Sequence, residues 1–474
     1  MPTETILTAL ILIAGFYMAW NIGANDVANA MGTSVGSGAL TLKRAVLIAA
    51  VLEFAGAFFF GSYVSETVQN GIINSAIFAT KPILLVYGML ASLAAAGIWL
   101  QIASYYGWPV STTHSIIGAI VGFGVVVGGI EAVYWENVFF IFGSWILSPI
   151  AGAILSFIIF TLLRRKIFYT SNPVEAAKKL TPFLVFIVAS TLSLILVFNG
   201  LKNLNLNLTT WQSLLLSLLG GCLGALISYF CVQRIKTTST PKEESPHYNP
   251  EIAVGLDKAK KHLQRVRSSS TGATQYQVTL LLEEVNALSQ SLKEKVEAHT
   301  SNADYAAVER IFGYLQIMSA CLMAFAHGAN DVANAIGPLS AAIGVLKSGV
   351  ISTHGAVPAW ALGLGGVGIV IGLATWGWRV IETIGKKITE LTPTRGFAAE
   401  FGAAATIAIA SRLGMPISTT HTLVGSVIGV GFARGIEALN LTTMRDIIIS
   451  WVVTVPAGAG IAVGLFYLIN TIFG

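Results

Sequence analysis

The chain has 474 residues, of which 54% are hydrophobic and 11% are charged, and its formal net charge is +5. Soluble domains carry about 25% charged residues, so this composition excludes a soluble enzyme and indicates apolar surface that faces lipid. The basic residues stand in short clusters between apolar segments, a distribution that does not indicate a nucleic-acid partner.

Apolar segments of about 20 residues recur along the chain, and each is long enough to cross a hydrocarbon core. The first begins with Glu4, lacks a basic region before it and continues into Asn21, so we expect a membrane helix rather than a signal peptide. Reading apolar runs between polar breaks predicts about twelve spans, at residues 5–36, 43–65, 81–106, 110–130, 137–163, 181–199, 208–234, 305–340, 356–380, 395–412, 416–434 and 446–472.

The basic residues predict how these spans are oriented. With the N-terminus outside, the inward loops contain Lys43, Arg44, Arg164, Arg165, Lys166, Lys178, Lys179, Lys386, Lys387, Arg434 and Arg445. The outward loops contain little more than Lys81, Lys202 and Lys347. Because cytoplasmic loops are enriched in Lys and Arg, we expect a multi-pass protein of the cell inner (plasma) membrane with both termini outside.

One long polar segment, 235–304, separates the seventh and eighth spans. Within it Leu281, Val285, Leu288 and Leu292 recur at helical spacing, which indicates an amphipathic helix. We interpret this segment as a cytoplasmic helical connector, with a regulatory module as the alternative.

Three sequence blocks occur twice, 305 to 307 residues apart. The pairs are Gly23–Ala30 with Gly328–Ala335, Pro109–His114 with Pro416–His421, and Trp145–Ala153 with Trp451–Ala459. Seven spans precede the second copy, and because seven is odd, that copy enters the membrane from the opposite side. Inverted repeats with broken or re-entrant helices are the architecture of many secondary transporters, although a duplicated pore or scaffold is the alternative.

The duplication divides the chain into four parts. We expect a first repeat (1–163), connecting membrane helices (164–234), the cytoplasmic loop (235–304) and a second repeat (305–474). The resulting fold class is an all-α integral membrane protein.

The first repeated block brings amides and carboxylates to membrane depth, where an Asp costs about 2.5 to 3.5 kcal/mol on insertion scales. Flanking glycines favour a broken helix with free carbonyl oxygens, and such oxygens together suit a small cation such as Na⁺. The alternative is hydrogen bonding between helices. The predicted sodium ligands are Asn25, Asp26, Asn29, Asn330, Asp331 and Asn334, with Glu53 and Glu400 as further acidic candidates.

The second repeated block predicts two helix starts, each with a Pro before a run of hydroxyls and with Ser111 or Ser418 as the cap. A helix N-terminus with free amides binds oxyanions. The predicted phosphate-binding residues are Ser111, Thr112, Thr113, Ser418, Thr419, Thr420, Gln101, Asn25 and Asn330. Proton relay or hydrogen bonding to phosphate is expected of His114, His421 and His327, with a histidine bonded to a backbone carbonyl as the alternative.

Together these duplicated blocks, Gly-Ala-Asn-Asp-Val-Ala-Asn and Pro-x-Ser-Thr-Thr-His, resemble the signature of the inorganic phosphate transporter (PiT) family. The resemblance implies sodium- or proton-coupled phosphate uptake, an inverted-repeat fold, homodimers and functional roles for Glu53 and Glu400. A third family glutamate has no counterpart, because Met89 stands in its place, which favours Na⁺.

The sequence therefore predicts a symporter of Na⁺ and inorganic phosphate that works by alternating access, with no organic cofactor. The alternatives are a proton-coupled carrier of phosphate, metal phosphate or sulfate, and an anion channel. A membrane-bound enzyme is disfavoured, because Ser, His and Asp occur in two copies without a strand-borne nucleophile.

Overall fold

Helices make up most of the residues that the computed structural model describes. The model describes residues 3–197, 208–234, 250–300, 303–351, 357–378, 380–381, 391–435 and 441–474. In these ranges there is no strand, only an isolated bridge between Ile73 and Val133. The predicted all-α class is confirmed. The predicted loop residues Lys202, Lys386 and Lys387 lie outside the described residues.

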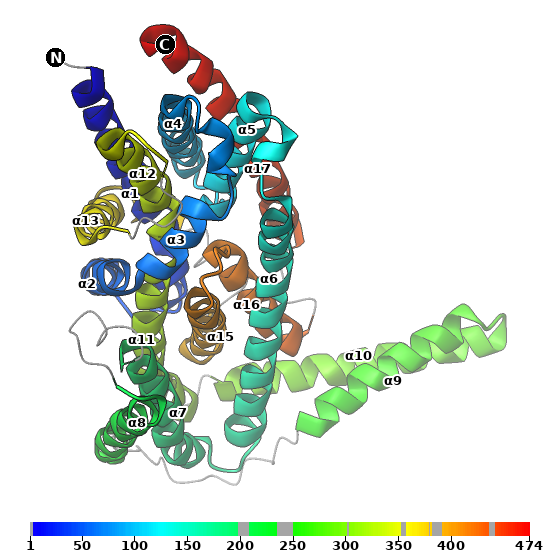
Figure 1. Cartoon of the computed structure of the whole chain (residues 1–474). Coiled ribbons are helices and arrows are strands. Elements are labelled where there is room, and N and C mark those ends of the chain that lie inside the picture. Colours follow the sequence, from blue (N-terminus) through cyan, green and yellow to red (C-terminus); the bar gives the residue numbers. More distant parts are fainter. Residues whose placement is uncertain are drawn as a thin grey trace.

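The helices of the first part of the chain surround a central region (Figure 1). They are α1 (Thr3–Gly36), α2 (Leu42–Phe60), α3 (Ser62–Asn70), α4 (Pro82–Tyr106), α5 (Thr112–Gly128), α6 (Trp135–Leu163), α7 (Pro173–Ile195) and α8 (Thr210–Gln233). The second part supplies α11 (Ala303–Asp331), α12 (Ala333–Ser348), α13 (Ala359–Thr375), α15 (Pro393–Arg412), α16 (Thr419–Arg434) and α17 (Leu441–Phe473).

Between these parts, α9 (Pro250–Ser268) and α10 (Ala273–Thr300) form a hairpin that projects sideways from the bundle (Figure 1). The predicted amphipathic helix lies within α10. The predicted face was wrong, because Leu281 and Leu288 are exposed and the buried apolar residues of this helix are Val278 and Leu282. Residues 235–249 and 301–302 of the predicted loop lie outside the described residues.

Within the described ranges, seven helices are long and apolar enough to cross a membrane, or eight if α2 and α3, bent by 60°, form one span. The chain is therefore a multi-pass membrane protein, but the predicted twelve spans are not confirmed. Four predicted spans instead form the shorter or less apolar helices α5, α13, α15 and α16. The chain turns back after α4 and after α15, at Gly107 (φ +69°) and Gly414 (φ +68°).

The two turns share one geometry. In each, the glycine N–H bonds to a serine carbonyl three residues back, and the next N–H bonds to the carbonyl five residues back, which is the Schellman motif. A positive φ is readily available only to glycine. The repeated sequence therefore produces the same helix end twice.

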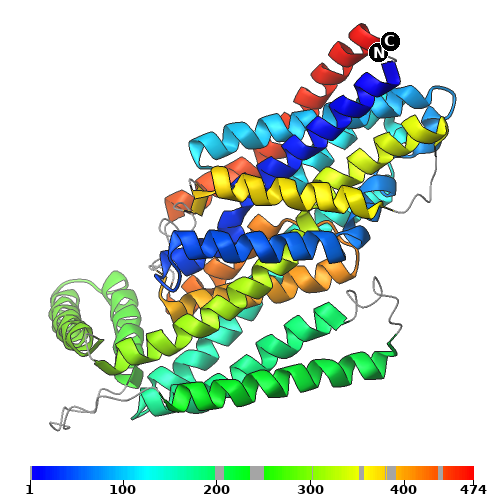
Figure 2. The same ribbon diagram turned by 90° about the vertical axis from the view of Figure 1, so that its left-hand side faces the viewer.

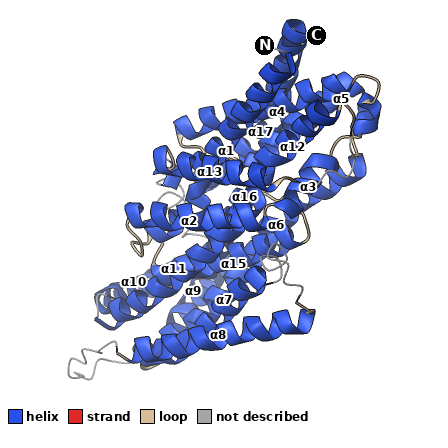
Figure 3. Cartoon of the chain, turned by 60° about the vertical axis from the view of Figure 1, so that its left-hand side comes forward, coloured by secondary structure: helices blue, strands red, loops and turns tan. Residues whose placement is uncertain are grey.

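Many helices of one part pack against helices of the other part, although pairs such as α7 with α8 and α11 with α15 pack within one part. The helix α1 packs on α13, α2 packs on α11, α5 packs on α17 and α6 packs on α16. Figure 2 shows α13 (yellow) beside both α1 and α2, and the view in Figure 3 shows the same layering of helices.

These crossings depend on glycines that let backbones approach closely. A Cβ atom on Gly23 would lie 1.9 Å from the Ile369 carbonyl oxygen, and one on Gly328 would lie 2.2 Å from the Glu53 carbonyl oxygen. The two glycines occupy the same position of the repeated block. The same packing requirement is therefore met in both copies.

Replacing a glycine at such a crossing tests the packing. A Cβ on Gly372 of α13 would lie 1.9 Å from the Trp20 carbonyl oxygen of α1, whereas one on Gly464 of α17 meets nothing within 4 Å. We expect Gly372→Ala to destabilise the protein by about 1 to 3 kcal/mol through overpacking. Gly464→Ala, a matched control in another helix, should leave the Tm of the purified protein in detergent unchanged or slightly higher. Equal Tm values for the two variants would contradict this account.

Candidate functional site

The two Asn-Asp blocks meet in the centre of the bundle. The first lies in the middle of α1 and the second where α11 joins α12. All six of their polar side chains are at most 1% exposed: Asn25, Asp26, Asn29, Asn330, Asp331 and Asn334.

The helix break expected in these blocks occurs in only one of them. In the first copy α1 continues unbroken from Thr3 to Gly36, so the prediction was wrong there. Its Gly23 serves the close crossing with α13 instead of interrupting the helix. In the second copy the helix is interrupted at Val332, whose N–H lies a long 3.4 Å from the Gly328 carbonyl oxygen.

The first asparagine of each block anchors the turn before the Ser-Thr-Thr helix of its own half. Asn25 Nδ2 donates to Ser104 Oγ at 3.0 Å and to the Trp108 carbonyl at 3.2 Å. Asn330 makes the equivalent bonds, to Ser411 Oγ at 3.0 Å and to the Met415 carbonyl at 3.2 Å. Each turn is thereby fixed to the helix that bears the carboxylate.

The second asparagine of each block reaches the opposite half, and both aspartates contact threonines at the start of α16. Asn29 Nδ2 donates to Thr420 Oγ1 at 2.8 Å and to Asp26 Oδ1 at 2.9 Å. Thr419 Oγ1 donates to Asp331 Oδ2 at 2.7 Å, and Thr420 Oγ1 lies 3.2 Å from Asp26 Oδ1. The hydroxyls of α16 thus contact the carboxylates of both blocks.

The other half shows the same exchange. Asn334 Nδ2 donates to Thr112 Oγ1 at 3.2 Å and to Thr113 Oγ1 at 3.1 Å. Thr113 Oγ1 in turn donates to the Ile417 carbonyl, 3.0 Å away, just before α16. The starts of α5 and α16 therefore lie against each other in the protein centre.

Both predicted helix caps are confirmed. Ser111 Oγ accepts a hydrogen bond from His114 N at 3.2 Å, and Ser418 Oγ accepts one from His421 N at 3.1 Å. Each cap uses one first-turn amide, so other first-turn amides of α5 and α16 remain without intrahelical partners.

Six buried oxygen atoms in the centre have no hydrogen-bond partner. Each residue of the two Asn-Asp blocks supplies one: Asn25 Oδ1, Asp26 Oδ2, Asn29 Oδ1, Asn330 Oδ1, Asp331 Oδ1 and Asn334 Oδ1. A buried polar atom without a partner costs about 1 to 3 kcal/mol. Six together, all acceptors of the hard-oxygen type, form a set that a cation such as Na⁺ would satisfy.

A histidine connects this cluster to the predicted acidic candidate on α2. His327 Nε2 lies 3.0 Å from Asp331 Oδ2 and 3.8 Å from Asp26 Oδ2, and its Nδ1 lies 3.4 Å from Glu53 Oε1. All four side chains are fully buried. One ligand atom from each of the two aspartates and the histidine lies within 4.8 Å of the others. The equivalent position before the first block is Ile22.

Glu400 was predicted with the same sodium set, but the contacts described for it form a separate cluster. Its carboxylate accepts hydrogen bonds from Ser34 Oγ at 2.6 Å, from Ser319 Oγ at 2.8 Å and from Thr33 Oγ1. Gln316 Nε2 lies 3.5 Å away. Sequence reasoning missed these partners, although hydroxyls and an amide within apolar helices were a usable signal.

The two motif histidines contact each other and aromatic rings. The ring centroids of His114 and His421 are 4.2 Å apart, and the rings stack on Trp145 at 3.7 Å and on Trp451 at 3.6 Å. Trp145 Nε1 donates to the Pro416 carbonyl at 3.2 Å, across the two halves. The histidines therefore join the two Ser-Thr-Thr helices at their first turns.

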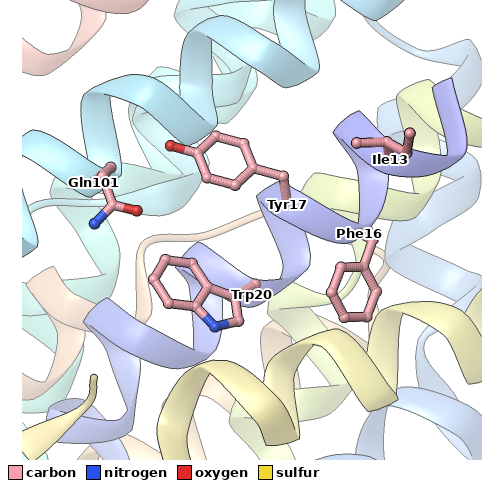
Figure 4. Close-up of a pocket in the computed structure, with 5 residues that line it drawn as sticks. All are labelled: Ile13, Phe16, Tyr17, Trp20 and Gln101. Atoms are coloured by element: carbon pink, nitrogen blue, oxygen red, sulfur yellow. The ribbon is translucent and has the colours of Figure 1, made fainter. Parts of the chain in front are cut away.

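Gln101, a predicted phosphate ligand, lies away from this cluster. It lines a shallow pocket together with Ile13, Phe16, Tyr17 and Trp20 of α1 (Figure 4). The lining is almost entirely apolar and aromatic, which does not suit a desolvated anion. The structure therefore separates Gln101 from the other residues of the predicted set.

Comparison with known proteins places the chain among transporters. The model of the phosphate transporter family matches residues 22–462. The chloroplastic inorganic phosphate transporter 2-1 of Arabidopsis thaliana is 47% identical over 464 residues, covering 97% of this chain and 71% of that protein. A solved structure of a sodium-dependent phosphate transporter superposes with a TM-score of 0.79 at 36% identity, covering 98% of this chain and all of that one. These relatives are transporters, not enzymes.

The crossed hydrogen bonds predict energetic coupling between the halves. Asn29→Ala and Thr420→Val each remove one side of a buried 2.8 Å hydrogen bond. We expect a coupling free energy of about 0.5 to 3 kcal/mol in a double-mutant cycle measured by unfolding of the purified protein. As a control, Asn29→Ala combined with Thr209→Ala, which removes the exposed cap of α8, should be additive within about 0.5 kcal/mol. Additivity in both cycles would refute the coupling.

Proposed function

Because the chain belongs to the phosphate transporter family, we propose that it carries inorganic phosphate across the membrane together with Na⁺, by alternating access. Both would bind where the two Asn-Asp blocks meet the starts of α5 and α16. One observation carries this proposal: the six unpartnered buried oxygens lie beside the N-termini of α5 and α16. The oxygens need cations, and the helix N-termini suit an oxyanion.

The phosphate ligands we propose are the hydroxyls and amides at the two helix starts. They are Ser111, Thr112, Thr113, Ser418, Thr419 and Thr420, all at most 2% exposed. Within the described hydrogen-bond network of this cluster no donor is Arg or Lys. A permanent guanidinium clamp would hold phosphate in the absence of Na⁺, so its absence from this network favours binding that depends on cations.

Charge explains why the cargo and the ion would move together. Asp26 and Asp331 would place two carboxylates beside a phosphate, and in a weakly polar interior that repulsion is strongly unfavourable. Bound Na⁺ reduces the negative charge, and the N-termini of α5 and α16 contribute about half a positive charge each. Loss of Na⁺ would then expel the phosphate.

We further propose that the repeats, 1–163 and 305–474, are inverted, and that α4–α5 and α15–α16 are re-entrant hairpins whose tips meet at the membrane centre. The buried contact between Thr113 and Ile417 at these tips supports the idea. In Figures 1 and 3, α4 and α5 lie toward the end with both termini, whereas α15 lies toward α9 and α10. If the α4–α5 hairpin does not cross the membrane, five spans precede α11. Because five is odd, the second repeat would still enter the membrane from the opposite side.

This arrangement keeps both termini outside and the α9–α10 hairpin in the cytoplasm. The plasma-membrane location, which was predicted together with the orientation of the spans, and the homodimers, which the family resemblance implies, stay predictions. Hairpins that enter from opposite faces would let the central cluster open to one side at a time.

Proton coupling is the second candidate, and His327 is the observation that favours it. The imidazole bridges Glu53 and Asp331, and a histidine can exchange a proton near neutral pH. Uptake driven by a pH gradient without Na⁺ would support this alternative.

Radiolabelled phosphate uptake into proteoliposomes tests the sodium proposal. At fixed pH, an inward Na⁺ gradient should stimulate uptake, whereas an equal K⁺ gradient should not. Asp26→Asn should reduce uptake to background, because the variant loses a charge that recruits Na⁺. Asp304→Asn, at an exposed position in the same half as the second block, is the matched control. Phosphate uptake that is equal with and without the Na⁺ gradient would contradict the proposed coupling to Na⁺. Full inhibition of phosphate uptake by sulfate would contradict selectivity for phosphate.

Cysteine labelling tests the hairpins. In a variant without Cys222, Cys231 and Cys321, a cysteine replacing Tyr106 at the α4 tip should resist a membrane-impermeant maleimide added from the cytoplasmic side. A cysteine replacing Arg44 should react from that side. Equal labelling of the two would show that α4 ends in a cytoplasmic loop, as a twelve-span topology requires.

A further inference from the structure

A second polar pocket lies on the side of the central cluster where α3 and α12 end. It has a volume of about 130 Å³ and lies between the end of α3, the start of α4 and the last turns of α12. That volume equals about four water molecules at their liquid density, which is sufficient for a small inorganic ion. Its polar lining comes from Gln69, Asn70, Ser75, Ser340 and Lys347.

One face of α12 forms the wall of this pocket. Ser340, Gly344 and Lys347 line it at spacings of four and three residues, so they share one side of the helix. Ser340 lies six residues beyond Asn334, or about 9 Å along the helix axis. The same helix therefore carries a central asparagine and the floor of the pocket.

Two buried polar atoms in the pocket have no partner. Ser340 is 6% exposed and its hydroxyl makes no hydrogen bond, and Gln69 Oε1 is likewise buried and unpaired. Such atoms each cost about 1 to 3 kcal/mol when nothing satisfies them. The unpaired donor, the hydroxyl, and the unpaired acceptor, the amide oxygen, have almost no accessible surface, so each would meet a ligand in the pocket after a rotation of its side chain.

A lysine side chain lies at the opening of this pocket. Lys347 is exposed, and its Nζ lies 5.9 Å from the centre of the Trp360 ring, which also lines the pocket. The ring quadrupole attracts the ammonium group and limits the positions it takes. The pocket thus has a positive entrance and a neutral, hydrogen-bonding floor.

We propose that this pocket is an outer binding site for protonated inorganic phosphate, occupied before the ion reaches the central cluster. The inference rests on the proposed function, which makes phosphate the cargo and puts the end of α12 outside. Lys347 attracts the anion. Once the two inaccessible side chains rotate toward it, Ser340 donates to a phosphate oxygen, and the P–OH group of the ligand donates to Gln69 Oε1. Sulfate has no hydroxyl at neutral pH and would leave that acceptor unpaired, so the site favours phosphate over sulfate.

Transport kinetics test the role of the entrance. Lys347→Gln should raise the apparent KM for external phosphate about three- to tenfold at low ionic strength, with maximal rate unchanged, and the increase should shrink as salt is added. Ser340→Ala should raise the KM at any ionic strength. Lys81→Gln, an exposed lysine that does not line the pocket, should match wild type. Efflux from the inner side should have the same KM in all variants.

Direct binding separates this site from the central one. In Asp26→Asn protein, with the central site disabled, titration with inorganic phosphate should still broaden the ³¹P resonance, and sulfate should not reverse the broadening. Adding Lys347→Gln should abolish it. Unchanged KM values for Lys347→Gln and Ser340→Ala, or broadening that survives Lys347→Gln, would overturn the proposal. Failure of the wild-type protein to take up phosphate would instead overturn the proposed function.

Discussion

The hydrogen bonds that cross between the two halves at the centre are the constraint on which the rest of the structure depends. Asn29 holds a threonine of α16, and Asn334 holds threonines of α5. In a protein whose solvent is lipid, no water replaces such bonds, so each half must supply the partners that the other lacks. These reciprocal hydrogen bonds fix the positions of the N-termini of α5 and α16. Because the amide nitrogens are used in it, the amide oxygens are left for ligands.

Much of this centre could be predicted from the sequence, because the relevant signals are local and repeated. A Pro followed by Ser-Thr-Thr marks a helix start in any environment, and Ser111 and Ser418 do cap α5 and α16. The identity of the partners could not be predicted, since a bond from Asn29 to Thr420 depends on how two distant helices cross. For the same reason Gln101 and Glu400 were grouped with the wrong neighbours. The twelve spans were not confirmed, because a buried apolar helix and a lipid-facing one have similar composition. The predicted break in α1 was wrong, because Gly23 serves a close helix crossing instead.

The halves are alike in their neutral contacts and unlike in their charges. His327 occupies the position equivalent to Ile22 of the first copy, and Glu400 occupies the position equivalent to Leu93. Two hydroxyls that hold Glu400, from Thr33 and Ser34, correspond to Pro338 and Leu339 in the second copy. The polar cluster around Glu400 therefore has no equivalent in the other half. The neutral hydrogen bonds of the two halves match, but their buried ionisable groups do not.

The length of chain between bonded partners has a consequence for how the protein is made. The bond between Asn29 and Thr420 joins residues 391 positions apart, and synthesis proceeds at about 5 to 20 residues per second. The first half therefore waits for tens of seconds with Asp26 in place and its partner threonine not yet synthesised. During that interval the Asp26 carboxylate of the nascent helix α1 has Asn29 of the same helix as a partner but lacks its threonine, which favours association with the insertion machinery or with membrane chaperones. A chain that stops before α16 would never gain the contact between Thr420 and that carboxylate, and quality-control proteases that recognise exposed polar groups within the membrane could detect it.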